Sequence, residues 1–322
     1  MWKTRVTEML GIKYPIIEGS FSGFGTSALA APVSEAGGLG MITAHVLRTP
    51  EGLREDIRRL KSRTDKPFAV SISPGICHDV DKMVEVVIDE GVPVLETSAT
   101  RGDVVGKRAQ AAGIKWIHKV ATVRHALSVE AQGADAVVIV GLEGTGLKSP
   151  AQLPTLITIP WAVRQIRIPI IAAGGIGDSY GFMAALAMGA EAVYMGTAFV
   201  TTKECPVPDH YKERLVEATP ADAKLRERIL TPPSAAEYEK VMKERGKIPE
   251  SEWLIKLERV ASNLPSDVSL SEESFYEAEE ILKVTPGSLA VAMIDKVVTV
   301  KELIENIISG AEAIRRRWSI NQ

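Results

Sequence analysis

The first two thirds of the chain contain eight short, mostly apolar segments. They lie at residues 14–17, 39–43, 68–72, 93–96, 115–120, 136–140, 169–172 and 192–195. Continuous apolar runs of this length are typical of parallel strands that are buried on both faces. Stretches with apolar residues at helical spacing lie between them, as at 49–63, 80–90, 123–132 and 180–188. The chain therefore reads as a series of strand–helix units.

A closed barrel accounts for eight such units better than an open sheet does. A doubly wound sheet is expected to have a G-x-G-x-x-G turn after its first strand, but residues 18–23 read Glu-Gly-Ser-Phe-Ser-Gly. The sequence thus predicts an α/β protein, with a (β/α)8 barrel over residues 1–205.

Residues 206–322 are charged and helical in pattern, and no flexible linker precedes them. We expect them to form a C-terminal helical extension that packs on the barrel and includes the final helix of the chain. Helices are expected at 221–230, 235–245, 252–262, 271–282 and 300–317.

Composition excludes several classes of protein. The formal net charge is −3, and the 38 basic and 41 acidic residues are interspersed, so neither a nucleic-acid-binding face nor a polybasic membrane surface is expected. We expect a cytoplasmic protein, since no apolar run is long enough to span a membrane and no signal peptide is evident. Cys77 and Cys205 are far apart and have no metal-ligand spacing, so no metal is expected. The expected partner is a small-molecule substrate, and a homodimer is left open.

Two glycine turns follow the seventh and eighth predicted strands. The first is Ala173-Gly174-Gly175-Ile176, and the second is Met195-Gly196-Thr197. Glycines let backbone N–H groups approach phosphate oxygens, and a threonine hydroxyl adds a donor. In (β/α)8 barrels the loops after these two strands commonly bind a phosphate. Two such turns in neighbouring units favour a phosphate site over a pair of ordinary tight turns.

Several sequence blocks together resemble the nitronate monooxygenase (2-nitropropane dioxygenase) family, which also contains FMN-dependent enoyl reductases and NADH:quinone reductases. They are residues 15–19, 29–40, 67–70, 117–120, 122–126, 133–136, 173–176 and 195–197. The resemblance implies that FMN is the cofactor and that NAD(P)H is a potential co-substrate. The cofactor-binding residues that it implies are Gly19, Ser20, Phe21, Ser71, Lys119, Glu143, Gly146, Gly174, Gly175, Met195, Gly196 and Thr197.

The chain departs from the family pattern at three places. Residues 18–21 read Glu-Gly-Ser-Phe where the family usually has Gln-Gly-Pro-Met, and Ser71 stands where an asparagine usually contacts the flavin. Leu147 occupies the position of the family's catalytic histidine. A leucine neither accepts a proton nor donates a hydrogen bond, so this change counts against ordinary nitronate deprotonation. Leu147 and its neighbour Lys148 are instead the expected substrate-contacting residues.

The remaining catalytic candidates are His118 and Lys119, which end an apolar strand near the expected flavin. A cation there would stabilise the reduced flavin anion, but Lys119 balancing Glu18 or Glu96 is an equally good interpretation. For Glu143 we prefer a structural role in its loop. For Lys148 an exposed, solvated lysine is somewhat favoured over an anion-binding one.

Three functions fit these features. The first is an FMN-dependent oxidoreductase of the nitronate monooxygenase type, which oxidises a small organic substrate with O₂. The second is an NAD(P)H-dependent FMN reductase of an enoyl thioester or a quinone, which the leucine at 147 favours because hydride transfer needs orientation more than a base. The third is an FMN-binding protein without turnover.

Overall fold

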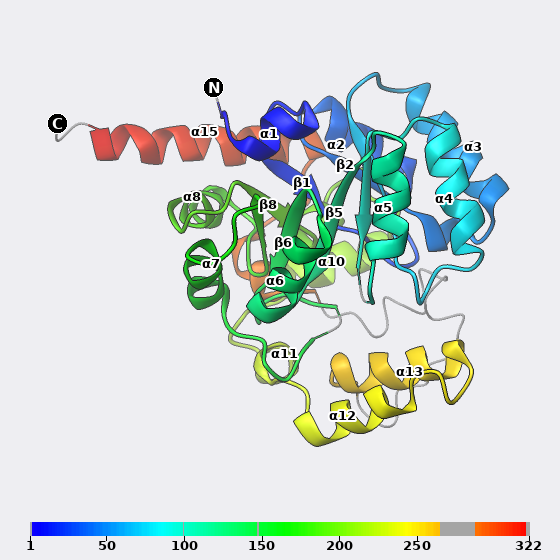
Figure 1. The fold of residues 1–322 in the computed structure, drawn as a ribbon. Coiled ribbons are helices and arrows are strands. Elements are labelled where there is room, and N and C mark those ends of the chain that lie inside the picture. The colour runs from blue at the N-terminus through cyan, green and yellow to red at the C-terminus, as the bar shows by residue number, and fades with distance from the viewer. Residues whose placement is uncertain (1, 99, 147, 265–286, 320–322) are drawn as a thin grey trace.

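The computed structural model describes residues 2–98, 100–146, 148–264 and 287–319. Its centre is a barrel of eight parallel strands surrounded by helices (Figure 1), which confirms the predicted fold class. The strands are β1 (Ile16–Glu18), β2 (Gly40–Thr43), β3 (Phe68–Ile72), β4 (Val94–Thr97), β5 (Lys115–Val120), β6 (Ala136–Val140), β7 (Ile170–Ala173) and β8 (Ala192–Met195).

Strand pairing runs in the order β1-β8-β7-β6-β5-β4-β3-β2. A parallel bridge between Ile17 and Leu39 brings β1 beside β2 and closes the barrel. The Glu18 N–H donates to the Leu39 carbonyl, and the Leu39 N–H donates to the Ile16 carbonyl, both at 2.9 Å. Closure satisfies the two edges that an open sheet would leave unpaired.

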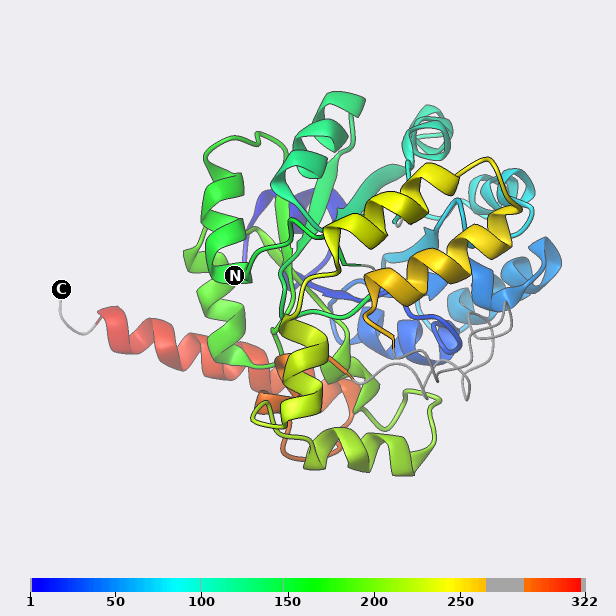
Figure 2. The ribbon, with the colours of Figure 1, turned by 90° about the horizontal axis from the view of Figure 1, so that it is seen from below.

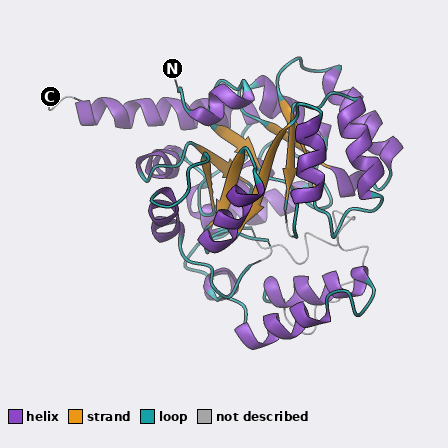
Figure 3. Cartoon of the chain, viewed as in Figure 1, coloured by secondary structure: helices purple, strands orange, loops and turns teal. Residues whose placement is uncertain are grey.

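Helices fill the connections between the strands (Figure 3). They are α1 (Arg5–Leu10), α2 (Ser27–Glu35), α3 (Pro50–Lys61), α4 (Val80–Asp89), α5 (Asp103–Ala111), α6 (Val123–Gln132), α7 (Thr155–Val163), α8 (Ser179–Ala187) and the short α9 (Thr197–Val200). Several begin with a side-chain cap: the oxygens of Thr49, Thr122 and Asp178 accept hydrogen bonds from N–H groups in the first turn. Such caps stabilise a helix start by about 1 kcal/mol.

Alternate residues of each strand serve two cores. Inward-facing residues such as Met41, Ala69 and Ile117 fill the barrel interior, whereas their neighbours pack against the surrounding helices. Val6 and Leu10 of α1 belong to the interior cluster, so α1 closes the amino-terminal end of the barrel. The carboxyl ends of the strands are left for a site, as in other barrels of this type.

Beyond the barrel the chain is helical. The elements are α10 (Asp209–Glu217), α11 (Ala223–Leu230), α12 (Ala235–Glu244), α13 (Glu250–Ala261), η3 (Leu289–Met293) and α15 (Val300–Ser319). The helices expected at 221–230, 235–245, 252–262 and 300–317 are present, whereas α10 was not expected and residues 271–282 lie outside the described part of the chain. In this part no helix has the length and apolar character of a membrane span.

The helices α12 and α13 form a pair near the carboxyl ends of the strands (Figure 2). Trp253, Leu254 and Val241 give this pair its own small core, and Ile76 from the loop after β3 packs on it. The long helix α15 lies on the other side of the molecule, against α8 and α2, and extends past them (Figure 1). The α12–α13 pair is therefore placed to contribute to a site at the barrel mouth, whereas α15 is not.

Candidate functional site

A pocket of about 490 Å³ opens at the carboxyl ends of the strands. The loops that follow all eight strands contribute to its walls, and residues of α10, α11, α12, α13 and the segment before η3 complete it. Its volume is within the range of small-molecule and cofactor sites, about 300–1,000 Å³.

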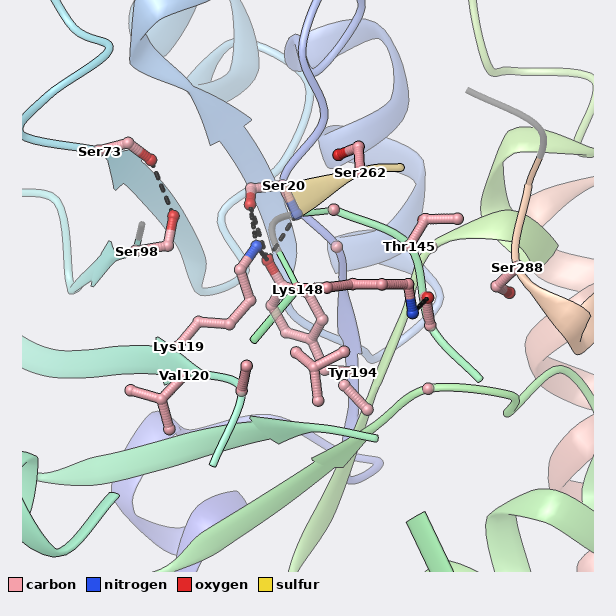
Figure 4. A pocket seen from close by; sticks show the side chains of 18 of the residues that line it. Ser20, Ser73, Ser98, Lys119, Val120, Thr145, Lys148, Tyr194, Ser262 and Ser288 are labelled. Carbon is pink, nitrogen blue, oxygen red and sulfur yellow. Dashed lines mark hydrogen bonds between the residues drawn. The ribbon is translucent and has the colours of Figure 1, made fainter. Parts of the chain in front are cut away.

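Lys119 is the charged side chain at the inner end of this pocket (Figure 4). It is the penultimate residue of β5, on the strand face that includes the interior residue Ile117. Its Nζ atom donates to Ser20 Oγ at 2.8 Å and to the Tyr194 hydroxyl at 3.2 Å. The ammonium also lies 5.0 Å from the centroid of the Tyr194 ring, a cation–π distance.

A buried carboxylate lies behind Lys119. Glu96 of β4 is fully buried, and its Oε1 atom is 3.7 Å from Lys119 Nζ. The Ser71 hydroxyl donates to Glu96 Oε2. Burial lowers the pKa of Lys119, but Tyr194 and Glu96 raise it by more, so that it lies above its ordinary value of 10.5. Lys119 is therefore a cation at neutral pH. It both pairs with Glu96 and lines the pocket.

His118 points to the other face of β5 and is not the second cation we expected. The indole Nε1 of Trp116 donates to Thr97 Oγ1 at 2.8 Å, and the same hydroxyl lies 2.6 Å from His118 Nδ1. Burial, with Lys119 adding to it, lowers the pKa of His118 to about 4. His118 borders the pocket but is neutral at pH 7, so the prediction of a positive charge on it is wrong.

The glycine turns after β7 and β8 both line the pocket. Gly174 and Gly175 have φ angles of 102° and 70°, a backbone conformation that side chains disfavour, and they leave the wall there free of Cβ atoms. Gly196 leads into Thr197, whose hydroxyl accepts from the Ser288 N–H at 3.0 Å and lies 2.8 Å from Ser288 Oγ. Two hydroxyls and two glycine turns thus converge on one region of the wall.

Ser288 is a site residue that sequence reasoning missed. It caps η3 in the C-terminal region, for which we expected only helices that pack on the barrel. The adjacent Gly287-Ser288 pair was the available signal, but nothing local indicates that it meets Thr197 across 91 residues.

Three residues assigned to the cofactor do not line the pocket. Ser71 lies under Glu96, and Met195 is fully buried in the core outside the strands. The Glu143 carboxylate accepts from the Thr155 N–H and hydroxyl, at 2.9 and 2.8 Å, which fits the structural role that we preferred for it. The assigned residues that do line the pocket are Gly19, Ser20, Phe21, Lys119, Gly146, Gly174, Gly175, Gly196 and Thr197.

Lys148 is not the solvated lysine that we favoured. Only 4% of the residue is exposed, and its Nζ atom donates to the carbonyls of Leu142 and Gly144 at 2.7 and 2.9 Å. Its N–H donates to the Ala261 carbonyl of α13 at 3.1 Å. Burial, partly offset by Glu143, lowers its pKa to about 8. Lys148 fixes the loop after β6 and ties it to the helical tail; Leu147 lies outside the described residues.

The lining of the pocket carries more basic than acidic side chains. Among its described lining residues Glu258 is the one acidic side chain, against the five cationic residues Arg101, Lys119, Lys148, Arg228 and Arg245. His45 and His125 also line it. Burial and Lys119 lower the pKa of His45 to about 4, so it adds no charge at neutral pH. The described lining of the pocket therefore carries a net positive charge, although the chain as a whole has a net charge of −3.

Cysteine and metal chemistry are not supported in the described residues. Cys77 and Cys205 are buried, and burial raises both pKa values to about 12, so neither is an activated thiolate. No group of three His, Cys, Asp or Glu side chains within the described ranges is arranged to hold a metal.

A closed barrel of eight parallel strands, with glycine turns after β7 and β8 and a pocket at its carboxyl end, defines a (β/α)8 barrel with its candidate site in the usual place. More specifically, the chain belongs to the nitronate monooxygenase family, whose model matches residues 3–74 and 75–310.

Similar proteins have different activities. The chain is 36% identical over 217 residues to the (3aS,4S,5R,7aS)-5-hydroxy-7a-methyl-1-oxo-octahydro-1H-indene-4-carboxyl-CoA dehydrogenase of Mycobacterium tuberculosis. The matched segment is 67% of this chain and 61% of the length of that protein. It is 32% identical over 263 residues to a probable nitronate monooxygenase of Staphylococcus saprophyticus, covering 68% of this chain and 74% of the relative.

Solved structures agree with the fold. FabK from Thermotoga maritima is 33% identical, with a TM-score of 0.75 and 99% of each chain covered. The nitroalkane oxidase of Streptomyces ansochromogenes, at 23% identity and a TM-score of 0.73, covers 98% of this chain and 99% of its own. The second likeness shows the shared barrel alone.

Proposed function

We propose that this protein binds FMN in the pocket and is a flavin-dependent oxidoreductase of the nitronate monooxygenase type. The observation that carries the proposal is the pairing, in one cavity, of the glycine–hydroxyl cradle with the buried ammonium of Lys119. The cradle suits a terminal phosphate, because Gly174 and Gly175 keep the wall free of side-chain atoms and Thr197 and Ser288 add hydroxyls. When bound, the flavin supplies reversible two-electron transfer.

The residues of this chain have distinct tasks in that scheme. Gly174, Gly175, Gly196, Thr197 and Ser288 would hold the phosphate. Lys119 would place a positive charge where the cofactor gains negative charge on reduction, which stabilises the reduced form more than the oxidised one. The Lys148 ammonium shapes the loop after β6 through its hydrogen bonds to the Leu142 and Gly144 carbonyls.

A reductase of an enoyl thioester or another acyl-CoA, with NAD(P)H as the electron donor, is the second candidate. The basic lining favours it, because Arg101, Arg228 and Arg245 suit the phosphates of a nucleotide-bearing substrate. The leucine at position 147 also favours it, since hydride transfer through a flavin requires no base there. The acyl-CoA named in the dehydrogenase relatives agrees with this substrate class.

Cofactor release and anaerobic reduction test both candidates. Purified protein should be yellow and release FMN, not FAD, on denaturation; colourless protein that takes up no FMN in a titration would reject the proposal. Anaerobic mixing with a nitronate, NADH or NADPH then shows which compound bleaches the flavin. Leu147→His should raise nitronate oxidation if the site is otherwise of the family type, and fast nitronate oxidation by the wild type would mean that another group is the base.

A further inference from the structure

The hydroxyl of Ser20 belongs to a closed triangle with Tyr194 and Lys119 (Figure 4). Lys119 Nζ lies 2.8 Å from Ser20 Oγ and 3.2 Å from the Tyr194 hydroxyl, and the two hydroxyl oxygens are 2.9 Å apart. The Ser20 N–H also donates to the Tyr194 hydroxyl at 2.6 Å. Every edge of the triangle is therefore a hydrogen bond.

Assigning each hydrogen of the three side chains to an acceptor shows which donor has no acceptor within the triangle. An ammonium only donates, so the lone pairs of Tyr194 accept from Lys119 and from the Ser20 N–H, and the tyrosine hydrogen goes to Ser20 Oγ. Ser20 Oγ then accepts from both Tyr194 and Lys119, which fills its two lone pairs. The hydrogen of Ser20 itself has no acceptor in the triangle, while its side chain lines the pocket.

The backbone around Ser20 is held on both sides. The Gly19 N–H donates to the Met195 carbonyl at 2.8 Å, and the Phe21 N–H donates to Thr43 Oγ1 at 3.1 Å. The Phe21 ring stacks on Phe24, with centroids 4.9 Å apart. The Ser20 hydroxyl is thus a positioned donor, and the adjacent ammonium of Lys119 strengthens it.

We propose that the Ser20 hydroxyl donates a hydrogen bond to a ligand carbonyl oxygen that gains negative charge on reduction. Two ligands present such an oxygen: the flavin, at its C2 carbonyl next to N1, and a thioester substrate, at its acyl carbonyl. The inference rests on the proposed FMN site and adds a recognition residue to it.

Substitution of Ser20 separates the two acceptors. Ser20→Ala removes the hydrogen, Ser20→Thr keeps a hydroxyl, and Ser73→Ala is the control, because Ser73 pairs with Ser98 at 2.8 Å elsewhere in the pocket (Figure 4). The first readout is the flavin midpoint potential without substrate. The second is the Kd of crotonyl-CoA, measured from the perturbation of the flavin spectrum.

A flavin acceptor predicts that Ser20→Ala lowers the ratio of reduced to oxidised flavin about tenfold at a fixed potential, or about 30 mV for a two-electron couple. A thioester acceptor predicts an unchanged potential and about tenfold weaker crotonyl-CoA binding. In either case Ser20→Thr and Ser73→Ala should stay near the wild type. If Ser20→Ala binds FMN and changes neither readout, the inference is overturned; if the wild type itself takes up no FMN, the proposed function falls with it.

Discussion

The Oε1 atom of Glu96 lies 3.7 Å from the Nζ atom of Lys119 inside the barrel. The two side chains come from the adjacent strands β4 and β5, and Ser71 of β3 holds the other carboxylate oxygen. An ammonium in an apolar interior would tend to lose its proton, and the nearby carboxylate opposes this. Glu96 therefore helps, together with Tyr194, to keep a positive charge on Lys119.

Glu96→Gln should give the flavin potential a steeper fall with pH than the wild type has, over the range in which Lys119 loses its proton. Glutamine has the same shape and can still accept from Ser71, but it removes the charge that helps to raise the pKa of Lys119. Lys119 then loses its proton at a lower pH than in the wild type. Above that pH the flavin potential should fall by an amount of the order of 30 mV, as in Lys119→Met, which should have the low potential at every pH. Redox titrations between neutral and alkaline pH decide this, and identical profiles for Glu96→Gln and wild type would contradict it.

Gly175→Asp should weaken FMN binding about tenfold or more, because it brings a carboxylate next to the expected phosphate and places a Cβ atom 3.0 Å from that of Glu143. Gly113→Asp is the matched control: its φ is also positive, at 81°, and its Cβ atom would meet nothing within 4 Å. Fluorescence titration with FMN gives both affinities. Equal losses in the two variants would show that backbone strain, not the phosphate site, is responsible.

Glu18→Gln should change how stability depends on pH. Glu18 is fully buried, and burial raises its pKa well above the ordinary 4.5, although the Met41 N–H at 3.0 Å lowers it in part. A carboxyl with a raised folded-state pKa stabilises fully below its unfolded pKa and loses that contribution as pH rises towards the folded value. The variant should therefore gain stability over wild type from about pH 4.5 upward, by up to about 1.4 kcal/mol per pH unit.

Urea unfolding at a series of pH values from about 4 to about 8 measures the difference in the free energy of unfolding. Glu55→Gln, on the exposed face of α3, is the control. A difference between Glu18→Gln and wild type that does not vary with pH would mean that Glu18 is ionised in the folded protein.

Gly106→Ala should destabilise the protein, against the usual preference of helices for alanine. Its Cβ atom would lie 2.1 Å from the ring of Trp116, which is fully buried and bonded to Thr97. Overpacking of this kind costs about 1–3 kcal/mol, whereas alanine in a helix otherwise gains up to about 1 kcal/mol over glycine. Gly181→Ala in α8 is the control, because its Cβ atom would make only an ordinary 3.4 Å contact. Thermal unfolding should show opposite signs for the two variants.

The sequence by itself determined the strands of this protein and the glycine turns after β7 and β8. All eight strands were expected within two residues of their observed bounds. Strands and helices could be predicted because their hydrophobic periodicity depends only on residues that are contiguous in the sequence. Gly174, Gly175, Gly196 and Thr197 were identified in the same way, since a glycine turn after a strand is a local pattern.

Tertiary structure decided which polar side chains meet. Ser20 and Lys119 are 99 residues apart, Lys119 and Tyr194 are 75 apart, and Thr197 and Ser288 are 91 apart. The sequence placed His118 and Lys119 side by side, yet it could not show that one would be buried and neutral and the other charged. A pKa depends on burial and on the charges nearby, and for these residues both arise only when the barrel closes and the helical tail packs on it.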